Sequence, residues 1–304
     1  MNGIDYRELK KALEQTDKII TPRLSAWLLT EADNALPEKV AQKMQDLLTT
    51  QPRYRGRSFS ASSATYCLRS QLFSYLDAPA TQHDGRLMNI FMDGKWRHLR
   101  WQAMCLMAGI LIDIEFPLDW PRKRSKGSMD GVGVVPDDHP RLRWRGKEFG
   151  FELKGMNSMI YQKVVATDTL KPEHVGQIAR YFLLSGLELF VYVIEDKSTQ
   201  HWHEVVADRT EPFWANAIEE QRWELNELNK AVVKKRLPDR IPECAQLKGP
   251  TFMGCSFGGR TGVCARITEW PDNETLRPVP KQPRKVKPKT VPSKPIKRVR
   301  KKGP

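Results

Sequence analysis

The sequence has no long apolar run and few cysteines. None of its segments approaches the roughly 18 consecutive apolar residues that a membrane span needs, and its first residues are polar, unlike a secretory signal. Five cysteines in 304 residues are too few, and odd in number, for a disulfide scaffold. We therefore expect a cytoplasmic protein in a reducing compartment, neither membrane-bound nor exported.

Positive charge is concentrated near the C-terminal end. The net charge is +14, and residues 271–304 hold twelve Lys or Arg, two Asp or Glu and eight of the 21 prolines. Dense proline disfavours helix and sheet, and like charges extend a chain. We therefore expect a disordered Lys/Pro-rich tail over 271–304. It is either a solubilising end or an arm that adds salt-sensitive affinity for nucleic acid, and we favour the second.

Hydrophobic periodicity divides the rest of the chain. Apolar residues at helical spacing over 5–50 predict a helical N-terminal extension, residues 1–57. Helices are expected at 60–76, 87–110, 173–185 and 211–236, and strands at 112–118, 128–135, 148–155, 189–195 and 201–207. Strands interleaved with helices indicate an α/β fold, with the core at 58–243 and a C-terminal cap at 244–270.

Three charged side chains are expected to meet on a hairpin. A turn cluster at 136–140 separates two strand-like runs, and a hairpin centred near residue 141 places Asp130 opposite Glu152. Lys154 lies two residues further and shares a face with Glu152. Neighbouring carboxylates repel each other unless a cation lies between them, so the pattern predicts a Mg²⁺ or Mn²⁺ site. A surface Glu–Lys pair is the alternative.

Asp137 competes with Asp130 for this role, because Pro136-Asp137 followed by Glu152-Leu-Lys154 also spells a metal-site motif. The same hairpin puts Asp137 in the turn, roughly 23 Å along a strand from Asp130. We therefore choose Asp130.

Four motifs resemble the RecB-type branch of the PD-(D/E)xK nucleases. In order they are Gly94-Lys-Trp-Arg-His98, Gly127-Ser-Met-Asp130, Glu152-Leu-Lys154 and Gln177-Ile-Ala-Arg-Tyr181. The resemblance covers residues 58–265. It implies a restriction-endonuclease-like core, with a mixed central sheet flanked by helices, and an Mg²⁺- or Mn²⁺-dependent deoxyribonuclease.

The same resemblance assigns roles to individual residues. It implies that Asp130, Glu152, His98 and the backbone carbonyl of Leu153 bind the metal ion. It also implies that Asp130, Glu152, Lys154, Gln177 and Tyr181 form the catalytic set. Gln177 and Tyr181 share one helix face and are expected to face the cleft.

Four cysteines resemble the iron–sulfur branch of these nucleases, which includes the AddB nuclease domain and CRISPR-associated RecB-like exonucleases. Cys67 is expected on the helix over 60–76, and Cys244, Cys255 and Cys264 follow the core at gaps wider than the family's. The resemblance implies a 4Fe–4S cluster. A four-thiolate Zn²⁺ site and free thiols remain alternatives. Cys105 lies among apolar residues and is expected in the core.

The expected function is hydrolysis of DNA phosphodiesters by a sequence-independent exonuclease, rather than an endonuclease, in recombination, repair or phage DNA metabolism. The sequence shows no zinc-finger spacing or helix-turn-helix, so the DNA backbone is the expected partner, together with a recombination or helicase protein. Base stacking or core packing is expected of Trp96, Trp101, Trp144 and Tyr161. The alternatives are a catalytically retired nuclease fold and a zinc-bound nucleic-acid-binding protein.

Overall fold

The computed structural model describes residues 17–30, 36, 38–49, 57–81, 84–259, 262–272 and 276. The predicted tail from residue 277 onward lies outside the described residues, as does the helical pattern before residue 17. No helix in the described part of the chain is long and apolar enough to span a membrane.

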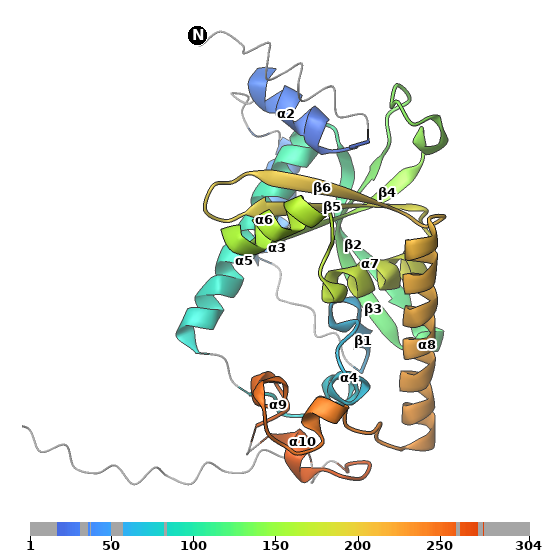
Figure 1. Cartoon of the computed structure of the whole chain (residues 1–304). Helices are drawn as coiled ribbons and strands as arrows, with labels where there is room; N and C mark the ends of the chain where they lie inside the picture. Colours follow the sequence, from blue (N-terminus) through green and yellow to red (C-terminus); the bar gives the residue numbers. More distant parts are fainter. Residues whose placement is uncertain are drawn as a thin grey trace, which may run out of the picture.

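A six-stranded mixed sheet forms the centre of the fold (Figure 1). Its members are β1 (Phe59–Ser60), β2 (Leu111–Trp120), β3 (Ser125–Val134), β4 (Glu148–Met156), β5 (Leu189–Asp196) and β6 (Trp202–Asp208). β2, β3 and β4 pair antiparallel in succession, β5 runs parallel to β4, and β6 returns antiparallel to β5. All five predicted strands are present. The two-residue β1, parallel to β3, was not predicted.

Helices cover both faces of the sheet. One face is covered by α6 (Ser158–Thr167), α7 (Pro172–Ser185) and the beginning of α8 (Pro212–Lys234), and the other by α2 (Thr21–Thr30) and α5 (Gly85–Met107). The predicted apolar stripe of α7, which includes Ile178, Ala179 and Phe182, is buried against the sheet. Every residue of β5 is buried because the strand is central and covered on both faces. The predicted fold class, a mixed sheet flanked by helices, is confirmed.

The described part of the N-terminal extension packs onto the core. It contains α2 and α3 (Glu38–Thr49). Ile19, Ile20 and Trp27 belong to the same buried cluster as residues of β4 and β5. Glu204 of β6 holds the beginning of α2, since its carboxylate accepts hydrogen bonds from the amides of Ile20 (3.1 Å) and Thr21 (2.7 Å). These amides would otherwise lack a partner at the helix end.

The helix predicted from residue 60 begins later. α4 spans Leu68–Tyr75, and the segment before it forms β1 and the 3-10 turn η1 (Ala61–Ser63). Tertiary hydrogen bonds explain the difference, because the Phe59 carbonyl accepts from Ser125 Oγ at 3.0 Å and the Ser60 carbonyl accepts from Arg180 at 3.0 Å. Cys67 is therefore not inside a helix. It caps α4, and its thiol accepts a hydrogen bond from the Ser70 amide at 3.3 Å.

The C-terminal segment forms three short helices that were not predicted. They are η4 (Pro242–Cys244), α9 (Pro250–Gly254) and α10 (Val263–Arg266). They pack with α4 and the end of α8 around a third buried cluster that includes Phe73, Leu228 and Phe257. Trp270 and Leu276 also pack against this cluster. The cap is thus a packed unit that joins the two ends of the core.

Candidate active site

The hairpin of β3 and β4 has the predicted register. Gly131 pairs with Phe151, and Val132 pairs with Gly150. Asp130 and Glu152 lie one residue beyond these pairs and are 7% and 2% exposed. Asp130 Oδ2 also accepts a hydrogen bond from the Leu153 amide at 2.8 Å. The structure therefore brings these two carboxylates together in a buried position, as predicted.

Asp137 lies in the turn between β3 and β4, next to Gly146. The ladder runs from Gly131 to Val134 toward this turn, so Asp130 and Glu152 lie beyond its opposite end. The register therefore agrees with the choice of Asp130 over Asp137.

Helix α5 supplies two further groups to the Asp130 side of the site. His98 Nδ1 lies 3.1 Å from Asp130 Oδ1, so the structure places these two predicted metal ligands side by side. Gln102, one turn later, donates to the Asp130 carbonyl (2.9 Å) and to Glu115 Oε1 (2.9 Å). Glu115 of β2 lies opposite Asp130, between the Ile114–Gly131 and Phe116–Met129 pairs, and has φ of 51°.

Gln102 and Glu115 were not identified from the sequence. The spacing of four residues from His98 was a usable signal for Gln102, because such residues share a helix face. Glu115 lies in the regular part of the β2–β3 ladder, from Asp113 to Trp120, so pairing these two strands as a hairpin around residues 121–124 would have placed it opposite Asp130.

Helix α7 and strand β4 complete the Glu152 side of the site. The Lys154 ammonium pairs with Glu152 Oε1, and Gln177 Nε2 donates to the same oxygen at 2.8 Å. Gln177 also donates to the Tyr181 hydroxyl at 2.8 Å, which in turn donates to the Ser128 carbonyl at 2.8 Å. Gln177 thus contacts the predicted metal ligand directly.

Tyr181 was predicted to face the cleft, but the structure buries it, and it supports Gln177 instead. It is 3% exposed and stacks on Phe190, with ring centroids 5.8 Å apart. A Cβ added to Gly127 would lie 3.1 Å from the Tyr181 ring. The glycine three residues before Asp130 therefore leaves room for the tyrosine that orients Gln177.

One carboxylate oxygen of the site is unsatisfied. Glu152 Oε2 is buried and has no hydrogen-bond partner among the described residues, and the same holds for the hydroxyl of Tyr192. Tyr192 is the β5 residue that pairs with Glu152 in the parallel register. Burying a polar atom without a partner is costly, so a ligand that pairs with these two oxygen atoms would stabilise this corner of the site.

The charges of the site are strongly coupled. Burial, and then the negative charge of Asp130, raise the pKa of Glu152 to about 7. Burial acts to raise the pKa of Asp130, but the charge and hydrogen bond of His98, the charge of Lys154 and the Leu153 amide together outweigh it, so the pKa of that carboxyl is lowered. Burial acts to lower the pKa of His98, yet the charge and hydrogen bond of Asp130 and the charge of Glu152 together outweigh it, so the pKa is raised. The two carboxylates therefore do not both ionise easily without an added cation.

The arrangement fits a divalent cation without displaying a closed cage. Within the described ranges, no three His, Cys, Asp or Glu side chains surround one point closely enough to hold an ion. His98 is instead paired with Asp130, and Lys154 with Glu152. Carboxylate oxygens and an imidazole are nevertheless a suitable donor set for Mg²⁺ or Mn²⁺. The unsatisfied Glu152 Oε2 supplies a position for such an ion.

Two of the four candidate base-stacking residues are in the core. Trp101 is fully buried and Trp144 is 2% exposed, so neither can contact a nucleotide in this conformation. Tyr161 is partly buried against the α7 face of the sheet. Trp96 is 54% exposed and lies two residues before His98 on α5, so it remains a candidate.

Four thiols line one cavity away from these carboxylates. They belong to Cys67, Cys244, Cys255 and Cys264, and the lining also includes Arg69 and Arg240. Burial raises the pKa of Cys67, and the other three thiols add to this shift. The hydrogen bond from the Ser70 amide lowers the pKa but does not cancel the rise. The structure thus brings together all four cysteines that were predicted to share a metal centre. Cys105 is buried in the cluster between α5 and the sheet, as predicted.

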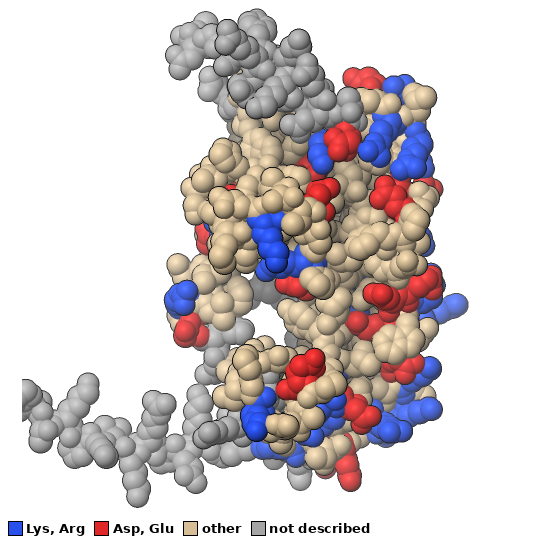
Figure 2. Space-filling model, in the orientation of Figure 1, with Lys and Arg blue, Asp and Glu red and all other residues tan. Residues whose placement is uncertain are grey.

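Surface charge is mixed on the face shown in Figure 2. Lys and Arg side chains are interspersed with Asp and Glu side chains along the α8 side of the molecule. All twelve Lys and Arg of the C-terminal 34 residues lie within 277–302. The chain's excess of positive charge is therefore mainly a property of that segment.

A scan against protein-family models finds no match, and neither does a search of curated protein sequences. Structural neighbours include LHK-Exo in complex with dAMP, with 16% identity and a TM-score of 0.41 over 59% of this chain and 92% of that chain. A second structure of LHK-Exo, an alkaline exonuclease from Laribacter hongkongensis, gives 15% identity and a TM-score of 0.36 over 59% and 95%. The protein SSO0001 gives 13% identity and a TM-score of 0.38 over 72% of this chain and 91% of that chain. These TM-scores are low, so the likenesses identify neither the family nor the activity of this chain.

Proposed function

We propose that this protein is a metal-dependent DNA nuclease that cleaves phosphodiesters without reading sequence, and that it acts as an exonuclease in recombination, repair or phage DNA metabolism. The observation that carries the proposal is the convergence of Asp130, Glu152 and Lys154, with Gln177 bonded to Glu152 and His98 paired with Asp130. A retired site has no reason to keep two buried carboxylates that repel each other.

In this proposal four groups would hold the cation: the carboxylates of Asp130 and Glu152, the Leu153 carbonyl and His98. A bound divalent cation supplies Lewis-acid chemistry, since it polarises a phosphate oxygen and lowers the pKa of water. Lys154 places an ammonium beside Glu152, where it stabilises negative charge on the reacting phosphate. Gln177 and Gln102 orient the two carboxylate-bearing strands through the hydrogen bonds described above.

We propose a 4Fe–4S cluster for the four-cysteine cavity, with Zn²⁺ as the alternative outcome of the test. Four thiolates are the usual ligands of such a cluster, and Arg69 and Arg240 in the cavity lining offset their negative charge.

End-labelled linear and circular DNA, incubated with Mg²⁺ or Mn²⁺, tests the proposed activity. We expect mononucleotides or short products from linear DNA and no cleavage of closed circles. Glu152→Gln and Asp130→Asn should each lower the rate at least about 100-fold, the scale of losing one transition-state-stabilising group. Asp137→Asn is the matched control and should retain activity. Cleavage that persists with a chelator, or in Glu152→Gln, would overturn the proposal.

A further inference from the structure

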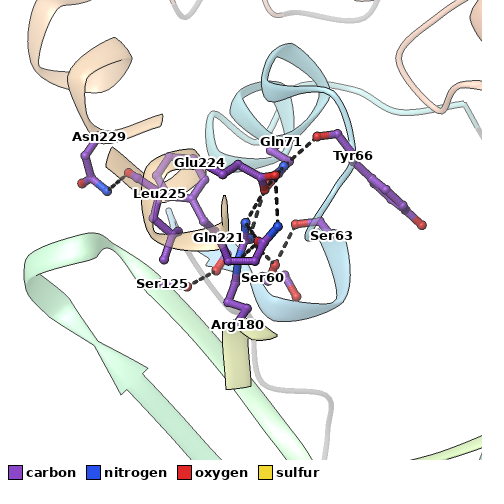
Figure 3. Close-up of polar contacts among 11 residues, drawn as sticks. Ser60, Ser63, Tyr66, Gln71, Ser125, Arg180, Gln221, Glu224, Leu225 and Asn229 are labelled. Carbon is purple, nitrogen blue, oxygen red and sulfur yellow. Dashed lines mark hydrogen bonds and ion pairs between the residues drawn. The ribbon is translucent and has the colours of Figure 1, made fainter. Parts of the chain in front are cut away.

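Arg180 is the central residue of a buried polar network between α7, α8 and α4 (Figure 3). It is fully buried. Its guanidinium donates to Gln221 Oε1 (2.8 Å), to the Ser60 carbonyl (3.0 Å) and to Gln71 Oε1 (3.1 Å), and it pairs with Glu224. One side chain thus joins helices α4, α7 and α8 and the last residue of β1.

The network continues toward the four-cysteine cavity. Gln71 Nε2 donates to the Tyr66 carbonyl at 2.7 Å and to Glu224 Oε1 at 2.7 Å. Tyr66 directly precedes Cys67, whose thiol lines the cavity. Gln71 therefore fixes the backbone position from which the first thiol extends.

The same network adjoins the catalytic side of α7. Arg180 lies three residues after Gln177 and directly before Tyr181. Gln177 donates a hydrogen bond to Glu152 and another to Tyr181, so these two residues together orient Glu152. The chain before Cys67 packs against this helix, since a Cβ added to Gly176 would lie 2.3 Å from Thr65 Cγ2. The Tyr66 ring points away from the network in Figure 3.

Packing alone does not require this network. A buried ion pair contributes little net stability compared with well-packed apolar residues of similar volume. Its hydrogen bonds instead impose a defined geometry on the elements that they join. Here those elements carry a cavity thiol on one side and Gln177 on the other.

We propose that Arg180 and Gln71 are positioning residues that couple the four-cysteine centre to the catalytic metal site. The proposal rests on the proposed function. When the cysteine centre is loaded, Cys67 and Tyr66 are fixed, Gln71 and Arg180 hold α7 in place, and Gln177 keeps Glu152 oriented for the cation. Coupling between two sites is reciprocal, so loading the catalytic site also stabilises the cysteine centre.

Mn²⁺ titration of the full chain, followed by electron paramagnetic resonance, tests the coupling without measuring cleavage. Emptying the cysteine centre of the wild-type protein should weaken Mn²⁺ binding at the Asp130–Glu152 site by at least about fivefold, the lower end of typical allosteric couplings. Emptying the cysteine centre should change Mn²⁺ affinity by less than about twofold in two variants, Gln71→Met and Arg180→Lys. The first keeps the side-chain volume, and the second keeps the charge beside Glu224. Arg222→Met, on the exposed side of α8, should retain the full effect.

A second comparison covers the case in which the emptied protein unfolds. With the cysteine centre loaded, Gln71→Met and Arg180→Lys should still bind Mn²⁺ at least about fivefold more weakly than the wild type and Arg222→Met, with unchanged iron or zinc content. Equal Mn²⁺ affinity in all four proteins would overturn the coupling while leaving the nuclease proposal intact. A cysteine centre that takes up neither iron nor zinc would also overturn it. A wild-type protein that binds no Mn²⁺ and cleaves no DNA would contradict the proposed function itself.

Discussion

The carboxylate of Asp130 accepts a 2.8 Å hydrogen bond from the amide of Leu153, the residue that follows Glu152. This bond extends the β3–β4 pairing beyond Gly131 and Phe151 through a side chain. It holds the two acidic residues close together whether or not a cation is bound. The resulting repulsion contributes, after burial, to raising the pKa of Glu152 to about 7.

Mn²⁺ affinity should depend on pH through Glu152. Its carboxyl is mainly protonated below about pH 7 in the metal-free protein, and metal binding must displace that proton. Affinity should therefore rise as pH increases toward 7, by up to about tenfold per unit, and level off above it. The metal-free fold should lose stability over the same rise, because the unfolded chain ionises this group at lower pH. Calorimetric titrations at pH 6, 7 and 8 check this, and a flat profile would contradict it.

Lys154→Ala should separate metal binding from catalysis. The charge of Lys154 lowers the pKa of Glu152, so its loss should raise that pKa and move the pH dependence of Mn²⁺ binding upward. At pH 8.5 the variant should still bind Mn²⁺ but cleave DNA about 100-fold more slowly, because the ammonium no longer stabilises the phosphate. Parallel calorimetry and single-turnover cleavage measure the two effects. Unchanged cleavage would remove Lys154 from the catalytic set.

Anaerobically purified protein should be brown and contain iron and sulfide. Cys67→Ala should remove the colour and destabilise the fold, because this ligand joins α4 to Cys244, 177 residues later. By analogy with a disulfide that closes so long a loop, the cost is about 5 kcal/mol. Cys105→Ala is the matched control and should keep its colour. Colourless protein with one equivalent of zinc would replace the cluster with a zinc site.

Removal of residues 277–304 should weaken DNA binding and flatten its salt dependence. The deletion removes twelve Lys and Arg but keeps Trp270 and Leu276, which pack on the C-terminal cluster. The slope of log K against log salt falls in proportion to the phosphates neutralised. Fluorescence anisotropy at several salt concentrations measures it, with cleavage at low salt as the control. An identical slope would show that the tail only solubilises the chain.

The catalytic hairpin could be predicted because its information is local. The turn residues around 136–140 lie between two runs with strand periodicity, and their midpoint fixes which residues face each other. The positions of Asp130, Glu152 and Lys154 follow from that register alone. The apolar stripe of α7 was predictable for the same reason, since helical spacing places Gln177 and Tyr181 together on one side.

The rest of the site depends on contacts between distant segments. The predicted start of α4 was wrong because Ser125 and Arg180 donate hydrogen bonds to the carbonyls of residues 59 and 60, which therefore do not join the helix. No local pattern shows that Trp101 and Trp144 are buried while Trp96 is exposed. Glu115 lies opposite Asp130 in the β2–β3 ladder, and the pairing of these two strands was not predicted. The convergence of four cysteines came from family resemblance, and spacing alone would not have given it.

The bonds from Glu204 to the beginning of α2 have a consequence for biosynthesis. Ile20 and Glu204 are separated by 184 residues. Arg69 donates a hydrogen bond to the carbonyl of Ile267 in the cap, and these two residues are separated by 198. At 5–20 residues per second, a ribosome takes roughly 10–40 s to reach each later partner. During that interval α2 and α4 emerge without the strands and helices against which they pack. The N-terminal apolar residues therefore remain exposed for most of translation, which makes this stretch of the nascent chain a natural substrate for chaperones.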